Sequence, residues 1–494
     1  MLLAVLALLV APSLALTVPA ELRVSCASSP RAAARLPALQ LAAASKDDGD
    51  IITPTAGLSV SVACIGCVLF GYHLGVVNAP LDAIAESLGF AGNAVKQGQV
   101  VSAGLFGAFL GSLGGGPLAD GVGRRGSFFW TATVCAIGAA LCASASSFKA
   151  LLIGRLACGL GIGAALCSVS LFIGEVAPPS QRGFLASLNQ LFTCGGIALS
   201  IFAGLPLATA SSEYWRRMFA LAILPPVLQL VALLWVPESP RWLALAGRKA
   251  EADEAARRLW GSGAVAPLAE AAADGVAAAG GWGQLVSRRY RKLVATSCLL
   301  FVFQQFAGIN AVVFFSTKVF ASAGVGSAVV ASLVVASCNI GGTAVAGQLL
   351  DRLGRKPLLI GSFLGMSAAM LMMAAALALP ALAPLAAPVS VAGTIMYITC
   401  FALGVGPIPA IMTGELLPAA VRANGAAAAF STHWVCNLMI GNFFLLASAR
   451  YGVPACYTAF GIVAAAGAAF CAARVPETKG RSLEELEAEL APAL

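Results

Sequence analysis

The sequence predicts an all-α integral membrane protein with twelve transmembrane helices arranged as two similar six-helix bundles. Hydrophobic residues make up 59% of the 494 residues, charged residues only 11%, and the mean hydropathy is +0.88. A soluble domain carries about 25% charged residues, so this chain has too few polar groups to cover its apolar surface in water. Short motifs that recur in both halves of the chain predict an internal duplication.

The recurring motifs keep the same order and nearly the same offset, which makes chance similarity a poor explanation. They are GEVAPPSQRG (Gly174–Gly183) with GELLPAAVRANG (Gly414–Gly425), ADGVGRR (Ala119–Arg125) with LDRLGRK (Leu350–Lys356), and PESPR from Pro237 with PETKG from Pro476. A duplication of this kind is typical of membrane transporters.

Twelve apolar stretches have about the 20 residues needed to cross hydrocarbon. We expect them at 57–80, 98–119, 127–146, 150–174, 184–206, 217–236, 294–317, 327–349, 357–379, 388–413, 425–447 and 453–473. Six lie on each side of a charged stretch. We therefore expect a leader (1–55), an N-terminal bundle (56–236), a linker with amphipathic helices (237–292), a C-terminal bundle (293–474) and a tail (475–494).

Within the linker, the Glu251–Arg258 run predicts an amphipathic surface helix. The 53 glycines favour close helix packing in lipid, with an effect of composition alone as the alternative. All but one of the 14 cysteines lie in or beside apolar spans. The Cys64–Cys67 CxxC pattern falls inside the first span, so we interpret these cysteines as packing residues rather than redox or metal groups.

The loop charges predict the orientation. The loops on the linker side carry 19 Lys and Arg residues, and the opposite loops carry six. This asymmetry places the linker and the C-terminus on the positive-inside face, and it explains the net charge of +8. No basic cluster with interleaved aromatic residues occurs, so nucleic acid is not an expected partner.

The first 55 residues resemble a targeting segment. Met1–Leu16 is a short apolar run followed by small residues, as in a signal peptide, although it lacks Lys or Arg at its start. Glu21–Ser45 is rich in Ala, Ser and Arg with a single acidic residue, as in a plastid transit peptide. The two together predict a bipartite leader to a plastid membrane; a plain signal peptide or a disordered tail is the alternative.

Several motifs together resemble the sugar porters of the major facilitator superfamily, over roughly residues 56–490. They are the two Asp/Arg loops above, GRLACGLGIG from Gly154, GEVAPPSQRG, PESPRWL from Pro237, QQFAGINAVVFFST from Gln304, GVGPIPA from Gly404 and PETKGRSLEE from Pro476. LFGYHLGVVNAPL from Leu69 and the His433–Trp434 pair are most similar to the plastidic glucose transporter subgroup. The resemblance implies the major facilitator fold.

Amide side chains inside the apolar spans are the candidate substrate ligands. Such groups are unfavourable in hydrocarbon unless they find partners, and each offers both a donor and an acceptor to a neutral polyhydroxyl ligand. A helix break near Gly308 would let Gln304 and Asn310 face one cavity. The resemblance assigns sugar contact to six amides; hydrogen bonding between helices is the alternative role. The six are Gln190, Gln304, Gln305, Asn310, Asn339 and Asn437.

Aromatic side chains supply faces for the apolar surface of a pyranose ring. The resemblance places Phe70, Phe314, Phe401 and Trp434 in the cavity wall, and core or lipid packing is the alternative for each. Two positions depart from the pattern of many hexose porters: Ala402 stands where Glu is frequent, and Ala410 stands where Trp is frequent.

His73 is the expected coupling position, with Arg155 as its partner. The resemblance implies that proton-coupled members have Asp where this chain has His73, near the Arg that matches Arg155. A cationic neighbour disfavours protonation of an imidazole. The pair therefore favours passive uniport, with His-mediated symport as the alternative because His titrates near physiological pH.

The charged loop motifs are expected to form the gate, through ion pairs that the resemblance implies cross between bundles when the carrier opens outward. Their members are Asp120, Arg124, Arg125, Glu175, Arg182, Asp351, Arg355, Lys356, Glu415 and Arg422.

The sequence thus predicts facilitated diffusion of a hexose, most simply glucose, across a plastid envelope membrane by a monomer. Proton-coupled sugar or polyol transport in the plasma membrane or an endomembrane is the second hypothesis, and a sugar sensor is the third. A sensor of this type usually carries a long soluble tail, which 475–494 does not provide. The sequence contains no P-loop or GxSxG pattern and only two histidines, so we expect no metal, cofactor or enzyme activity.

Overall fold

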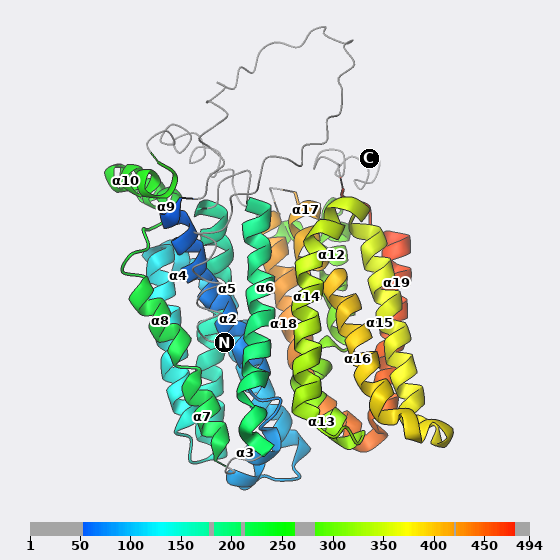
Figure 1. The fold of residues 1–494 in the computed structure, drawn as a ribbon. Coiled ribbons are helices and arrows are strands. Elements are labelled where there is room, and N and C mark those ends of the chain that lie inside the picture. Colours follow the sequence, from blue (N-terminus) through cyan, green and yellow to red (C-terminus); the bar gives the residue numbers. More distant parts are fainter. Residues whose placement is uncertain (1–52, 177–181, 209–212, 262–281, 419–420, 480–494) are drawn as a thin grey trace, which may run out of the picture.

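The computed structural model describes residues 53–176, 182–208, 213–261, 282–418 and 421–479. Within these ranges the regular structure is helical throughout, with no β-strand. The leader predicted over 1–55 falls outside the described residues except for its last three. Figure 1 shows upright helices in two groups, α2–α8 on one side and α12–α19 on the other, with α9 and α10 at the upper end of the first group.

The elements before residue 291 form the first group and the linker. They are α2 (Pro54–Gly75), α3 (Leu81–Ser87), α4 (Ala94–Ala143), α5 (Phe148–Val176), α6 (Arg182–Ala203), η3 (Leu205–Ala208), α7 (Tyr214–Leu221), α8 (Leu224–Ala232), α9 (Pro240–Leu245), α10 (Lys249–Trp260) and η4 (Trp282–Val286). The predicted amphipathic helix of the linker is α10, which buries Ala252, Ala255 and Leu259 while its charged residues lie at the surface.

The second group consists of α12 (Arg291–Phe306), α13 (Ile309–Ser322), α14 (Ala328–Leu353), α15 (Arg355–Ala378), η5 (Pro380–Leu385), α16 (Ala386–Leu403), α17 (Ile408–Leu416), α18 (Arg422–Tyr451) and α19 (Val453–Arg474). The two groups meet where α4 packs on α18 and α6 packs on α14.

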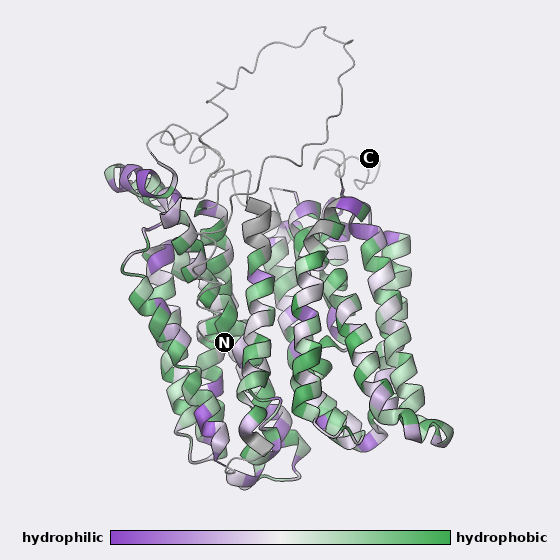
Figure 2. Cartoon of the chain, viewed as in Figure 1, coloured by the Kyte–Doolittle hydropathy of each residue, from purple (hydrophilic) through white to green (hydrophobic). Residues whose placement is uncertain are grey.

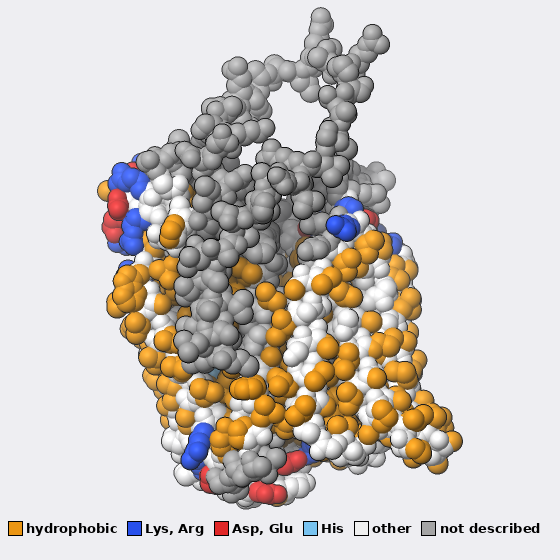
Figure 3. Space-filling view, viewed as in Figure 1, with side chains coloured by type: hydrophobic (Ala, Val, Ile, Leu, Met, Phe, Trp, Pro, Cys, Tyr) orange, Lys and Arg blue, Asp and Glu red, His pale blue; other side chains and the backbone are white. Residues whose placement is uncertain are grey.

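The predicted twelve crossings are confirmed. Ten helical stretches among the described residues are long and apolar enough to span a membrane. The longest, Ala94–Ala143, contains two crossings joined at Gly123, whose φ of 83° interrupts the helix. The 22-residue α6 supplies the remaining crossing. Figure 2 shows hydrophobic residues along most of the length of the upright helices. On the face in Figure 3, charged side chains gather at the two ends and hydrophobic side chains lie between them.

Three described crossings are interrupted: one between α7 and α8, and two in the second half that bear on the site. Gly308, with φ 101°, separates α12 from α13, which confirms the break predicted near this residue. A Cβ at Gly308 would lie 2.6 Å from the ring of Phe460, so the position also needs glycine for space. The second break, at 404–407, separates α16 from α17 and contains Pro407 at the start of α17. Both breaks leave backbone carbonyls without helical partners.

Helices α4 and α5 approach through glycine. A Cβ at Gly107 would lie 2.3 Å from the Leu156 carbonyl oxygen, and one at Gly159 would lie 2.0 Å from the Gly104 carbonyl oxygen. Cysteine thiols occupy the remaining gaps, since the Cys158 sulfur lies 2.8 Å from where a Gly138 Cβ would stand. The cysteines among the described residues are all free, as the packing interpretation expects.

We predict that Gly107→Ala destabilises the protein while Gly114→Ala does not. The Gly107 methyl group must displace the α5 backbone, a change that costs about 1–3 kcal/mol in a well-packed core. A Cβ at Gly114, on the same helix, meets nothing within 4 Å. Thermal unfolding in detergent measures both variants. Equal melting temperatures would show that α4 and α5 do not pack this closely.

Candidate functional site

Three of the six predicted amides lie together at the α12–α13 break. Gln304 and Gln305 lie in the last turn of α12, and Asn310 lies in the first turn of α13. Gln305 Nε2 donates to Gln304 Oε1 at 3.1 Å, and Asn310 Nδ2 donates to Gln305 Oε1. All three are at least 94% buried. The structure therefore assembles an amide cluster inside the membrane-spanning region, where each donor and acceptor would otherwise be unfavourable.

Gln304 also forms hydrogen bonds with the backbone at the second helix break, between α16 and α17. Its Nε2 donates to the carbonyl oxygens of Val405 at 2.6 Å and Gly406 at 3.0 Å. These carbonyls belong to the interruption between α16 and α17. The amide thus supplies donors that the broken helix lacks, and it ties the two interrupted crossings to each other.

His433 is a member of the cluster that the sequence analysis did not single out as a site residue. Its Nδ1 lies 2.7 Å from Gln305 Nε2, and its ring meets the Trp434 ring edge-on at 5.3 Å. The sequence did indicate His433, because it is a polar residue directly before Trp434, a predicted wall residue of the cavity. The amide–imidazole pair connects α18 to α12 across 128 positions of sequence.

The other three predicted amides are not part of this cluster. Gln190 is half-buried in α6, and its Nε2 lies 3.6 Å from the Cys194 sulfur one turn later. Asn339 in α14 and Asn437 in α18 are each at least 95% buried. The Oδ1 atoms of Asn339 and Asn437 have no hydrogen-bond partner among the described residues. Both acceptors are therefore available to a donor such as a hydroxyl group.

Two of the four predicted aromatic residues lie together. Phe70 and Trp434 meet edge to face with ring centroids 5.8 Å apart, one from each half of the chain. Phe314 is buried against Phe315, with centroids 6.1 Å apart. Phe401 lies beside the α16–α17 break, where its carbonyl oxygen accepts from Gly406 N at 2.8 Å.

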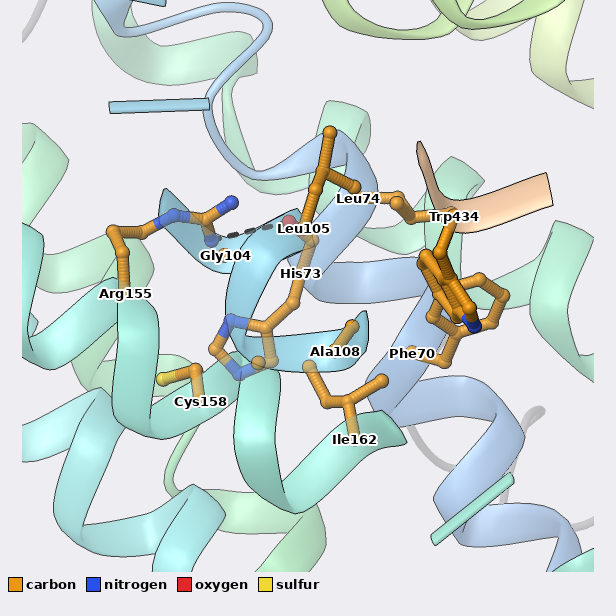
Figure 4. Close-up of a pocket in the computed structure, with 11 residues that line it drawn as sticks. Phe70, His73, Leu74, Gly104, Leu105, Ala108, Arg155, Cys158, Ile162 and Trp434 are labelled. Atoms are coloured by element: carbon orange, nitrogen blue, oxygen red, sulfur yellow. Dashed lines mark hydrogen bonds between the residues drawn. The ribbon is translucent and has the colours of Figure 1, made fainter. Parts of the chain in front are cut away.

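Phe70 and Trp434 line a cavity of about 20 Å³ together with His73 and Arg155 (Figure 4). Arg155 Nη1 donates to the His73 carbonyl oxygen at 3.2 Å, and Arg155 Nε donates to the Val100 carbonyl oxygen at 3.2 Å. The predicted neighbours are thus adjacent, but they interact through the backbone of His73. Both imidazole nitrogens are buried without a partner among the described residues.

At the linker end, the predicted gate charges form ion pairs within each half. Arg124 binds Glu175 with two hydrogen bonds, of 2.7 and 2.9 Å, and Asp120 at 2.9 Å. In the second half, Arg355 binds Glu415 at 3.0 Å. Of the other five gate residues, Arg125 and Lys356 form no ion pair among the described residues, and the side chains of Arg182, Asp351 and Arg422 lie outside the described part of the structure.

Two further carboxylates, Glu238 and Glu477, accept hydrogen bonds from the backbone just after Gly123 and Gly354. Their PESPR and PETKG motifs were recognised in the sequence, but the two glutamates were not predicted as site residues. Glu238 accepts from the backbone N–H groups of Arg124 at 2.9 Å and Arg125 at 3.1 Å. Glu477 accepts from those of Arg355 and Lys356, both at 2.9 Å. Each carboxylate therefore caps the N-terminus of the helix that follows the glycine.

The two capping carboxylates differ in acidity. Burial raises the pKa of Glu238, although three backbone N–H groups and Arg124 oppose the shift. Burial acts in the same direction on Glu477, but its backbone N–H donors outweigh it and lower the pKa of Glu477. The duplicated caps therefore share their geometry but not their electrostatic balance.

The end opposite the linker is joined across the two halves, by residues that the sequence analysis did not identify. Asn78 Nδ2 donates to the Val313 carbonyl oxygen and to Ser316 Oγ, both at 2.9 Å. Lys318 Nζ binds Asp82 at 2.8 Å and Gln97 at 3.1 Å. We call Asn78, Asp82, Gln97 and Lys318 the outer latch. Its presence indicates that the halves are closed together at this end.

Comparison with known proteins agrees with this architecture. The family model described as "Sugar (and other) transporter" matches residues 59–490. Plastidic glucose transporter 4 of Arabidopsis thaliana is 45% identical over 435 residues, covering 87% of this chain and 80% of that protein. The glucose transporter GlcP of Staphylococcus epidermidis is 35% identical, covering 87% of this chain and 96% of that protein. The inward-open xylose transporter XylE from E. coli superimposes with a TM-score of 0.75 at 26% identity, covering 87% and 98% of the two chains.

The fold and the site define a membrane carrier of two six-helix bundles with the major facilitator fold. The chain belongs to the sugar transporter family of the major facilitator superfamily.

We predict that Asn310→Ala and Gln304→Ala weaken sugar binding by about 1–3 kcal/mol, because each leaves a buried polar partner unpaired. This corresponds to roughly 5- to 150-fold in affinity. Gln304→Ala is also expected to lower stability, since it releases the α16–α17 carbonyls. Asn189→Ala is the matched control, an amide on α6 whose Oδ1 lies 3.7 Å from the Cys67 sulfur. Unchanged half-saturation in the Asn310 and Gln304 variants would remove the amide cluster from the binding site.

Proposed function

We propose that this protein carries glucose or a related hexose across a plastid envelope membrane by facilitated diffusion and alternating access. The observation that carries the proposal is the buried cluster of Gln304, Gln305 and Asn310. It presents amide donors and acceptors, as a neutral polyhydroxyl ligand requires, and no cationic side chain that would favour an anion. The names of the plastidic relatives and of GlcP support glucose as the substrate.

The proposed sugar site extends from the amide cluster to the outlying amides and the aromatic wall. Asn339 and Asn437 each have an unpartnered buried acceptor that a sugar hydroxyl would satisfy. Gln190 would contribute from α6, and Phe70, Phe314, Phe401 and Trp434 would contact the apolar surface of the ring. Phe70 and Trp434 come from the two halves of a single chain and meet edge to face, so we propose a monomer as the functional unit.

The proposed transport cycle exchanges contacts between the two ends of the molecule. The outer latch joins the halves on the side away from the linker, while the described ion pairs at the linker end stay within one half. This is the arrangement of a carrier that faces the linker side. Reversal would break the latch and bring the gate charges of the two halves together, so the balance of these contacts sets the conformational preference.

Uniport is supported by the surroundings of His73. Arg155 contacts the backbone of His73, and no described carboxylate forms an ion pair with Arg155. No proton-carrying acidic pair is therefore present at this position. The second candidate is proton-coupled sugar transport, favoured by the fold shared with a protein described as a proton:xylose symporter, which is 26% identical to this chain.

We predict that an inward proton gradient does not drive glucose above its external concentration in proteoliposomes. With no acidic group at position 73, the carrier can reorient without binding a proton, so transport follows the sugar gradient alone. His73→Asp places a carboxylate beside Arg155 and should make the rate more pH-dependent. Accumulation of sugar by the unmodified protein, abolished by a protonophore, would overturn uniport and favour the second candidate.

We also predict that residues 1–55, fused to a fluorescent protein, direct the fusion to the plastid. Removing Met1–Ala20 should divert it if the plastid lies within the secretory system, because the first apolar run would then act before the Ser- and Arg-rich segment. Fluorescence microscopy of both fusions is the measurement. Fluorescence of the full-length protein at the plasma membrane would contradict the proposed location.

A further inference from the structure

Arg155 is a buried cation without a carboxylate partner among the described residues. Arg155 is 3% exposed, and its guanidinium forms no ion pair with the carboxylates that the structure describes. Its two hydrogen bonds go to backbone carbonyl oxygens. A guanidinium remains protonated under all ordinary conditions, and an uncompensated buried charge is strongly unfavourable. An anion beside the guanidinium would therefore stabilise this part of the protein.

Arg155 and His73 both line one small cavity (Figure 4). Gly104 lines it and lets the guanidinium lie against α4, since a Cβ there would stand 2.8 Å from Arg155 Nη2. His73 is 3% exposed, and both of its ring nitrogens lack a hydrogen-bond partner among the described residues. A neutral imidazole has one N–H donor, so the cavity combines a fixed positive charge with an unused donor.

We propose that this cavity binds a small inorganic anion, a halide such as chloride, between Arg155 and His73. The guanidinium supplies the charge, and the imidazole N–H supplies a hydrogen bond. The cavity of about 20 Å³ exceeds the roughly 10–15 Å³ that a single water needs, but it is far too small for a sugar. The cavity lining contains no Asp or Glu, which would repel an anion, and no Lys that could bind it in place of Arg155.

The anion site includes both halves of the chain. Phe70, His73 and Arg155 come from the first half, and Trp434 from α18 closes the wall. A ligand enclosed by both halves binds the arrangement seen here better than one in which the halves have separated at this point. The anion therefore stabilises this conformation by mass action. The proposal does not depend on the transported substrate, because binding is measured without sugar.

Thermal stability of the detergent-purified protein tests the site. We expect a saturable rise in melting temperature with sodium chloride or bromide at constant ionic strength, and no rise with gluconate, which is too large to enter. His73→Phe should weaken the apparent halide affinity about tenfold by removing the hydrogen bond. His73→Asp should remove the halide response because the variant carries its own anion beside Arg155. Arg450→Gln, an exposed arginine at the end opposite the linker, should keep the full response.

Direct observation of the ion separates an anion site from a water-filled cavity. Crystals grown in bromide should show an anomalous peak between the Arg155 guanidinium and the His73 ring, and crystals of His73→Asp should lack it. Equal stabilisation by gluconate and halide would overturn the proposal, as would an unchanged response in His73→Asp. Crystals without a bromide peak would show that the cavity holds only water, which equally overturns it.

Discussion

The structure depends on one constraint: a polar group inside the hydrocarbon region must find its partner within the protein. Backbone groups meet it by forming helices, and α4 and α5 can approach because glycine brings backbone against backbone. The amides at the α12–α13 break meet it through one another and through His433. Arg155 meets it only partly, through two carbonyl oxygens that cannot balance its charge.

The candidate site lies where regular helices are interrupted. Gly308 separates α12 from α13, so Gln304, Gln305 and Asn310 lie on the adjoining ends of the two helices. The break between α16 and α17 exposes carbonyl oxygens that Gln304 Nε2 then satisfies. A continuous helix would have no such free groups to offer. The same interruptions that weaken two crossings therefore create the hydrogen-bonding surface that a sugar needs.

The duplication governs the two ends of the molecule differently. At the linker end both halves repeat one arrangement, in which an arginine follows a glycine of positive φ, binds a glutamate, and has a second glutamate capping its helix. The outer latch has no such repetition, since Asn78 and Asp82 of the first half contact α13 of the second. Repetition thus shapes each bundle, whereas unlike residues decide how the bundles meet.

The sequence by itself determined the class of protein and the helix break at which three of the six candidate amides meet. Hydropathy placed all twelve crossings because spanning the bilayer needs a long apolar run, a local property. The Gly308 break and its three amides were likewise predictable, since these residues are close in sequence. Tertiary structure alone decided that His433 joins Gln305, that Lys318 meets Asp82 across 236 positions, and that Arg155 contacts the backbone rather than the ring of His73. Such contacts depend on how the helices pack. The periodicity of one segment does not predict which face of a distant helix that segment will contact.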